Sequence, residues 1–399
     1  MGSVLFALFL FQAIPHEMGL SADCPENFVK AEDGRCYLDI AYQHYDVGMY
    51  GLRKAFRVTR DGLDPKSIDL GRLLFFDPIL SADRDMSCAH CHHPDYGFAD
   101  GRARAMGKGA TGFGPDRRGG LSLARSAPSL WNVGLMQRFN WDGAVSTLED
   151  QTQGPLFNPT EMGNTPQQLE RSLNQIPAYR ALFADAFPET ARQGIGVAQV
   201  VQAIADFERT LISVNSRYDL YVHGVRQVLS EEEVAGMNVF RSFVTRCSEC
   251  HMPPLFSNGQ IAVIGVPEKV GAEFDVGAGK QVPSQRGGFR VPSLRNVALT
   301  APYMHAGNLT DLAGVVDFYD NGGGRAFPGQ NADLFLHWHI VRSRLSRQER
   351  ENLVLFLKTL SDESGKPAIP LRVPSGLAVV PSRQTKETEQ LPDTHGRLP

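Results

Sequence analysis

The chain has 399 residues, with 44 acidic residues against 40 Lys and Arg, which gives a formal net charge of −4. Proteins that bind nucleic acid usually carry a basic face, and this balance gives no sign of one, so we expect no nucleic-acid partner. Hydrophobic residues make up 42% and charged residues 21%, a composition typical of a globular rather than a disordered protein. At roughly 150 residues per domain, the length predicts about two or three domains.

The N-terminal end begins with an apolar run at residues 4–14 that is too short to span a bilayer comfortably. No Lys or Arg precedes the run, as would be usual in a signal peptide, but we still interpret residues 1–22 as one and expect no stable membrane anchor. Cys24 and Cys36 are then free to bridge a short loop in an oxidising compartment. The periplasm is the expected location.

The other four cysteines form two tight pairs, and a histidine follows each pair at once. The motifs are Cys88-Ala-His-Cys91-His92 and Cys247-Ser-Glu-Cys250-His251. C-x-x-C-H is the attachment pattern of c-type haem, in which two thiols add to the vinyl groups and the histidine ligates iron. A redox C-x-x-C motif does not need the histidine, and a zinc site would need further ligands at metal spacing. Two copies predict two covalently bound haem c groups.

The surroundings of the two motifs repeat. Residues 128–133 read Pro-Ser-Leu-Trp-Asn-Val and residues 292–297 read Pro-Ser-Leu-Arg-Asn-Val. An apolar segment that starts at glycine precedes each haem motif, and a short Phe…Gly turn follows it. We therefore expect two cytochrome c-like haem domains related by internal duplication, at residues 23–225 and 226–365.

The remaining pattern predicts a mainly α-helical fold. Residues 197–213 place apolar side chains at helical spacing. Ser230 and Ser346 are predicted helix N-caps, and the second belongs to a capping box. Residues 366–399 are rich in Pro, Thr and polar residues without periodicity, so we expect a disordered tail.

A gap-free alignment of Pro128 with Pro292 places Trp141 opposite His305 and Pro155 opposite Tyr319. Tyrosine has an oxygen that ligates ferric haem, whereas proline offers no side-chain donor or acceptor. If this position approaches iron, the second haem is closed and the first is open to a small molecule. That asymmetry favours an enzyme with an electron-storage haem over a simple electron carrier.

Over about residues 65–362 the chain resembles the bacterial di-haem cytochrome c peroxidase and MauG family. Besides the haem motifs, the resemblance is carried by residues 70–78, 141–143, 154–162 and 292–305. It implies that the first haem is the peroxide site and the second the electron-transfer site. It also implies a tryptophan between the haems, at Trp141, and distal residues over the first haem. The distal residues that match are Gln151, Pro155 and Glu161.

The resemblance also separates two branches of the family. Its second-haem ligand is Met in ordinary peroxidases and Tyr in MauG, and Tyr319 stands at that place. Ordinary peroxidases often carry a histidine that blocks the first iron until reductive activation, but no histidine lies between Pro94 and Trp141. We therefore expect an open first haem, as in MauG.

The family also binds calcium between the haems. Thr300 and Pro302 match its ligand positions, whereas Ser126 stands where the family has Asn. We expect one calcium ion on this resemblance alone.

Each candidate residue also has an ordinary structural interpretation. Glu161 is either an exposed loop carboxylate or the acid–base group that moves a proton between the two peroxide oxygens. Gln151 would position peroxide by a hydrogen bond. Trp141 is either a core residue or a stop for hole transfer between the haems.

Around the second haem, Met304 competes with Tyr319 as the axial ligand. His305 is expected at a haem propionate or in the water network between the haems. Trp131 and Trp338 are interpreted as structural.

These observations predict a periplasmic di-haem peroxidase that uses H₂O₂ to oxidise an external donor, such as a residue of a partner protein. Two alternatives remain open. One is a cytochrome c peroxidase that receives electrons from a small cytochrome or copper protein. The other is a non-catalytic di-haem electron carrier, which would require two closed haems. Fold and chemistry alone do not identify the physiological donor.

Overall fold

The computed structural model describes residues 19–40, 62–268, 272–331 and 333–383, and this part of the chain is mainly α-helical, as expected. The helices are α2 (Pro65–Phe76), α3 (Leu148–Phe157), α4 (Pro166–Gln175), α5 (Pro177–Ala186), α6 (Thr190–Gln193), α7 (Val197–Arg209), α8 (Arg217–Val222), α9 (Glu231–Arg241), α10 (Cys247–Cys250), α11 (Leu312–Asp320), α12 (Pro328–Asn331) and α13 (Arg347–Lys358). Short strands form three antiparallel pairs. They are β1 (Phe28–Lys30) with β2 (Cys36–Leu38), β3 (Ala110–Thr111) with β4 (Arg118–Gly119), and β5 (Ile261–Val263) with β6 (Gly288–Arg290).

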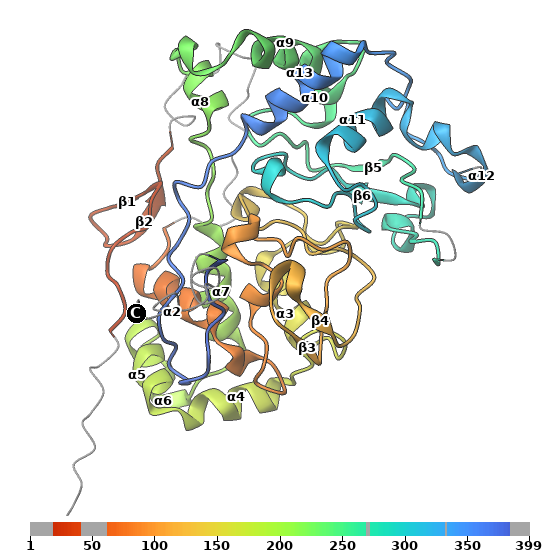
Figure 1. Ribbon diagram of the computed structural model, residues 1–399. Coiled ribbons are helices and arrows are strands. Elements are labelled where there is room, and N and C mark those ends of the chain that lie inside the picture. Colours follow the sequence, from red (N-terminus) through yellow and green to blue (C-terminus); the bar gives the residue numbers. More distant parts are fainter. Residues whose placement is uncertain (1–18, 41–61, 269–271, 332, 384–399) are drawn as a thin grey trace, which may run out of the picture.

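The elements form two stacked units, with α2–α7 in one and α9–α13 in the other (Figure 1). In the first unit, α2 packs along α7 directly before the first haem motif. A Cβ atom at Gly71 of α2 would lie 1.8 Å from the carbonyl oxygen of Ala203 in α7. The helices therefore cross where only glycine leaves room for the facing backbone. Buried residues of α2, α4, α5 and α7 fill the core beside this crossing, among them Leu70, Leu74, Leu173, Phe183 and Ile204.

The second unit repeats this arrangement with α9 and α13. A Cβ atom at Gly236 would lie 1.9 Å from the carbonyl oxygen of Asn352. Both helices begin at the predicted residues: Ser230 caps α9 and Ser346 caps α13, each in a capping box with the glutamate three residues later. The helix before each haem motif is thus held by the same kind of close crossing.

Equivalent residues recur at the spacing of 164 that separates Pro128 from Pro292. Asn132 and Asn296 both adopt positive φ, at 60° and 59°. The Asn132 side chain pairs with the backbone of Ser213 after α7, and the Asn296 side chain pairs with the backbone of Asp362 after α13. Each asparagine therefore joins its Pro-Ser-Leu-x-Asn-Val segment to the chain that follows α7 or α13.

The helices that carry Pro155 and Tyr319 also begin at equivalent positions of the repeat. Thr147 caps α3 and Asp311 caps α11, and each side chain accepts a hydrogen bond from the backbone three residues on. Because the caps are equivalent, Pro155 of α3 and Tyr319 of α11 occupy the same turn of their helices.

The predicted disorder from residue 366 onward is wrong for residues 366–383, which pack on the first unit beside α2 (Figure 1). Val373 and Val380 are buried in the cluster around Phe75 and Phe76. The Ser375 hydroxyl donates to a buried Asp77 oxygen at 2.6 Å. Burial raises the pKa of Asp77, although this and other hydrogen bonds oppose the shift. Residues 384–399 lie outside the described residues.

The C-terminal segment also closes over the loop that follows the first haem motif. His93 donates from Nε2 to the carbonyl oxygen of Pro381 at 3.1 Å, and the Asp95 carboxylate accepts from the Arg383 amide at 2.8 Å. Long-range contacts of this kind leave no periodic trace in the sequence, which explains why composition alone predicted a disordered tail.

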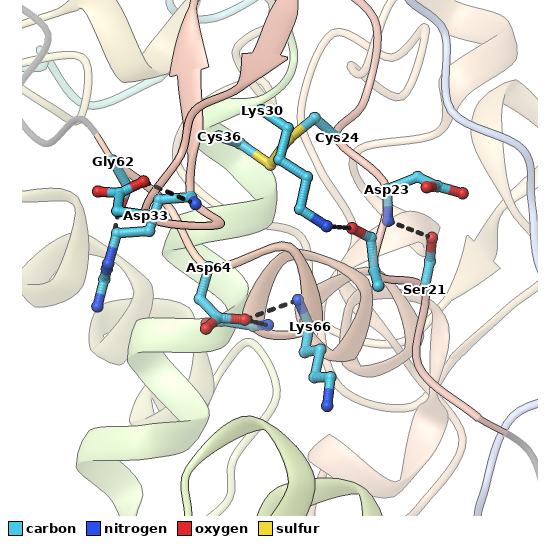
Figure 2. The surroundings of a disulfide bond; sticks show 12 residues. Ser21, Asp23, Cys24, Lys30, Asp33, Cys36, Gly62, Asp64 and Lys66 are labelled. Carbon is cyan, nitrogen blue, oxygen red and sulfur yellow. Dashed lines mark hydrogen bonds between the residues drawn. A yellow bond between two sulfur atoms is a disulfide. The ribbon is translucent and has the colours of Figure 1, made fainter.

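Cys24 and Cys36 form a disulfide with an S–S distance of 2.04 Å, and Figure 2 shows its surroundings. The Cys36 backbone bridges to that of Leu63, just before α2. The Ser21 amide donates to Asp69 of α2 at 3.0 Å. The start of the described chain is thereby fixed to the helix that leads into the first haem motif. Residues 1–18 of the predicted signal peptide lie outside the described residues, and none of the helices in the described part has the length and apolar character needed to cross a membrane.

The two glycine crossings predict a difference in stability. Gly71→Ala and Gly236→Ala each place a methyl group against a facing carbonyl, so each should lower the free energy of unfolding by about 1–3 kcal/mol. The control is Gly154→Ala in α3, where a Cβ atom would meet nothing within 4 Å and the lost glycine flexibility favours the helix. Denaturant unfolding of the three holoproteins measures the effect. Equal stability of all three would contradict the packing argument.

Candidate functional site: two haem-binding motifs

The first motif begins in a 3₁₀ helix, Cys88–His90, immediately after the turn that follows α2. The ring nitrogen Nδ1 of His92 donates to the carbonyl oxygen of Phe98 at 3.0 Å. This bond fixes the tautomer and leaves Nε2 with a lone pair for iron. Phe98 adopts a positive φ of 55°, which turns its carbonyl back toward the imidazole.

The second motif has the same geometry. His251 donates from Nδ1 to the carbonyl oxygen of Phe256 at 3.0 Å, and Phe256 has a φ of 53°. Burial lowers the pKa of both His92 and His251, which keeps each imidazole neutral and able to ligate metal. The Phe…Gly turns that follow the motifs therefore orient the two predicted iron ligands.

The four motif thiols are free, and burial raises the pKa of Cys91 to about 12 and that of Cys247 to about 11. Neutral buried thiols beside an oriented imidazole fit covalent attachment to haem.

An apolar cavity adjoins the second motif and brings together the residues predicted to surround the second haem. Cys247, Cys250 and His251 line it, and Tyr319 of α11 lines it as well. Burial, with a smaller effect from the two thiols, holds the pKa of the Tyr319 hydroxyl well above its usual range. Met304 lines the same cavity, so both axial ligands weighed from the sequence reach it.

Arg290 also lines this cavity, and the sequence reasoning missed it. Burial lowers the pKa of its guanidinium to about 10. Among the described residues it has no carboxylate within ion-pair distance, and Nε donates to the Asn140 carbonyl at 3.4 Å. A partly buried cation without an acidic partner in the described part of the chain fits one of the carboxylates of a haem.

Trp141 and His305 lie where the two units meet. The Trp141 indole donates to the Ser126 carbonyl at 2.9 Å, and the Ser126 amide donates to the His305 carbonyl at 2.7 Å. The His305 ring stacks on Phe289 at 4.0 Å, and its Nε2 lies 2.9 Å from Glu268. Trp141 and His305 both line the cavity beside the second haem motif. The His305 imidazole thus pairs with Glu268, and its predicted place at a haem propionate or in a water network between the haems stays a prediction.

On the side of the first motif, Gln151 and Pro155 lie one turn apart on α3, and Glu161 follows in the next loop. The Asn158 amide donates to Glu161 at 2.8 Å. Burial raises the pKa of Glu161 despite that hydrogen bond. Burial is the main cause of the raised pKa of the Cys91 thiol, and the Glu161 charge makes a smaller contribution in the same direction.

Two further charged residues of the first unit were not recognised in the sequence. Asp100 follows the Phe98 turn, and burial raises the pKa of its carboxyl to about 7. Arg102 keeps a buried Nε without a hydrogen-bond partner. An orphaned buried guanidinium nitrogen fits an anionic group of a bound haem. Only the pattern of the haem motif pointed to this loop, and no local signal marked these two residues.

A family model described as di-haem cytochrome c peroxidase matches residues 65–227. The methylamine utilization protein MauG of Methylorubrum extorquens is 33% identical over 312 residues, which cover 77% of this chain and 82% of that protein. The cytochrome c551 peroxidase of Pseudomonas aeruginosa is 32% identical over 309 residues, covering 76% and 81%. This chain belongs to the di-haem cytochrome c peroxidase and MauG family.

Solved structures agree with this family. A MauG-like protein associated with microbial copper homeostasis has a TM-score of 0.68 and 32% identity, over 77% of this chain and 93% of that one. The di-haem peroxidase BthA from Burkholderia thailandensis has a TM-score of 0.63 and 27% identity, over 80% and 91%. The protein is therefore a di-haem peroxidase, and membership of this family implies two haem c groups.

Arg290 gives a prediction for the second haem. Removing a partly buried cation beside this haem disfavours the reduced state, so Arg290→Gln should lower the midpoint potential of the second haem. Arg347→Gln is the control, because Arg347 is exposed on α13 and pairs with Glu351. A spectroelectrochemical titration of both variants measures the shift. An unchanged potential in Arg290→Gln would show that this guanidinium does not face the haem.

Proposed function

We propose that this di-haem peroxidase is MauG-like: H₂O₂ reacts at an open first haem, and a Tyr-ligated second haem holds oxidising equivalents for an external donor. The observation that carries the proposal is the matched position on α3 and α11. The same helical turn presents Pro155 in the first unit and Tyr319 in the second, where Tyr319 lines the cavity of the second motif. When bound, the haem irons supply peroxide binding and electron storage, and this chain supplies ligands, proton transfer and routes for electrons.

Tyr319 determines the branch of the family. Burial keeps its hydroxyl protonated in the absence of a metal, so coordination to ferric iron would have to displace the proton. A phenolate ligand is anionic and favours the higher oxidation states of iron, whereas a thioether favours the reduced state. Tyrosine ligation thus suits the storage of oxidising equivalents better than rapid turnover with a reduced cytochrome.

Glu161 is the proposed acid–base residue of the first site. Its carboxylate would take a proton from the near oxygen of H₂O₂ and deliver it to the leaving oxygen. Burial raises its pKa, and the Asn158 amide holds one of its oxygens in place. Gln151, on the neighbouring helix α3, would bind the peroxide, and Pro155 would leave the sixth position of the iron free.

The other proposals follow from the family resemblance and the repeated geometry. Trp141 would pass electrons between the two haem units, which we propose arose by internal duplication with domains at residues 23–225 and 226–365. Thr300 and Pro302 line the cavity beside the second haem motif and would contribute to a calcium site. The disulfide and covalent haem favour a periplasmic protein with a cleaved signal peptide.

The donor would be a protein, either one that supplies electrons or one with a residue that becomes oxidised. Cytochrome c peroxidase activity with a small cytochrome or copper protein is the second candidate. Met304 favours it, because this thioether lines the same cavity as Tyr319. A non-catalytic electron carrier would need a ligand on each haem, and Pro155 offers none.

Substitution of Glu161 tests the acid–base step. Glu161→Gln should slow the reaction of the ferric enzyme with H₂O₂ by about 10²–10⁴-fold, because the amide cannot accept the proton. The wild-type rate should fall as the pH drops through the raised pKa of Glu161, since the base must be ionised. Stopped-flow absorption over a pH series measures both effects. Glu351→Gln, at an exposed residue of α13, is the control, and wild-type kinetics in Glu161→Gln would remove this residue from the mechanism.

Low-temperature EPR of the ferric holoprotein tests the axial ligand. We expect one high-spin haem and one low-spin haem, and Tyr319→Phe should abolish the original low-spin signal while Met304→Leu preserves it. The opposite result would assign the thioether as ligand and favour the cytochrome c peroxidase alternative. Two low-spin haems in the wild type would contradict an open first site.

A further inference from the structure

Trp338 lies on the protein surface beside the second haem motif, and 65% of its side chain is exposed. Its ring centroid lies 3.7 Å from that of His339. His339 lines the cavity of the second motif, and one of its ring nitrogens lies within 4.8 Å of the Cys250 sulfur. Trp338, His339 and Cys250 thus form a continuous series of contacts from solvent to the sulfur that attaches the haem.

We propose that Trp338 is the surface site at which an external donor is oxidised, and that His339 connects it to the thioether of Cys250. The inference rests on the proposed function, because H₂O₂ must supply the oxidising equivalents. Each donor loses one electron, which passes through the Trp338 indole toward the second haem unit. Two such transfers, with two protons from solvent, complete the reduction of one H₂O₂ to two water molecules.

The other two tryptophans of the chain do not fit this role. Trp131 is only 2% exposed and belongs to the core around Phe75 and Phe98. Trp141 faces the junction of the units and is held there by Ser126. Indole loses an electron without first losing a proton, unlike the phenol of tyrosine, and Trp338 is the most exposed of the three tryptophans.

Charges beside the relay control where a positive hole would rest. The Arg246 guanidinium lies 5.1 Å from the centre of the Trp338 ring, so its charge disfavours a second positive charge on the indole. The Glu249 carboxylate lies 2.9 Å from His339 Nε2, on the inner side of the relay. An oxidised Trp338 is therefore a strong oxidant toward a donor at the surface.

The surroundings of Trp338 also fit a donor that arrives from solution. The two segments that meet at the Arg246–Trp338 contact carry large apolar side chains that remain exposed. These are Phe243, Val244, Met252, Phe335 and Val341. Apolar side chains gathered on a surface mark sites of association. We infer that the donor presents its oxidisable group from an aromatic or apolar face.

Trp338→Phe tests the relay, with Phe335→Leu as the matched control because Phe335 is 81% exposed on the same segment. The probe is the bulky aromatic donor ABTS. We expect Trp338→Phe to lower kcat/KM for ABTS at least tenfold, while the H₂O₂-induced haem spectra form at a rate within twofold of wild type. Phe335→Leu should retain more activity toward ABTS than Trp338→Phe does.

Three results would overturn the relay. They are full ABTS activity in Trp338→Phe, equal losses in both variants, or wild-type enzyme that reacts with H₂O₂ but not with ABTS. If Trp338→Phe lost the reaction with H₂O₂, the substitution would be disturbing the peroxide site and not donor oxidation, which would also contradict the relay. A wild-type enzyme whose haem spectra do not respond to H₂O₂ would instead contradict the proposed function itself, so the two failures are distinguishable.

Peptide mapping gives a readout that does not depend on turnover. After H₂O₂ is added without donor, oxygen-addition products should collect at Trp338 rather than at buried Trp131, and they should decrease when cyanide occupies the ferric first haem. Products at Trp338 that persist unchanged with cyanide would arise from exposure alone and would contradict transfer through the protein.

Discussion

The structure depends on one hydrogen bond in each unit, from the Nδ1 atom of the motif histidine to a carbonyl oxygen a few residues later. That bond selects the tautomer with Nε2 free, and Nε2 is the atom that we expect to ligate iron. The accepting carbonyls belong to Phe98 and Phe256, whose positive φ values turn the chain back on itself. Close helix crossings at Gly71 and Gly236 hold α2 and α9, the helices that precede the two haem motifs. Each motif therefore follows a helix whose position is fixed by packing.

The two haem-binding units have similar backbones, and only a few side chains give them different chemistry. Pro155 and Tyr319 occupy equivalent turns of their helices. Trp141 and His305 also occupy equivalent positions, because each directly follows a residue with positive φ, Asn140 or Met304. The backbone therefore does not distinguish a site for peroxide from a site for electron storage. The distinction lies in whether the side chain at the shared turn offers a donor atom to iron.

Local patterns predicted much of this protein. The C-x-x-C-H motifs, the helix caps at Ser230 and Ser346 and the spacing of 164 are all written in short stretches of sequence, so the mainly helical fold could be inferred. The packing of residues 366–383 could not, because Val373 and Ser375 meet partners almost 300 positions earlier. Arg290 was missed for the same reason: an ordinary arginine becomes informative only beside a haem motif from another segment.

The positions of the tryptophans give the proposed electron route a direction. Trp141 lies inward, where Ser126 fixes its indole at the junction of the units, whereas Trp338 lies outward beside Arg246. An inner relay between two haems must pass charge in both directions without loss, and a neutral hydrogen-bonded indole serves that need. An outer relay must oxidise a donor and then return to rest, and the guanidinium beside Trp338 makes the oxidised indole the less stable state. In the proposed route, tryptophan would thus serve two purposes, and the charged groups around each indole would determine which one.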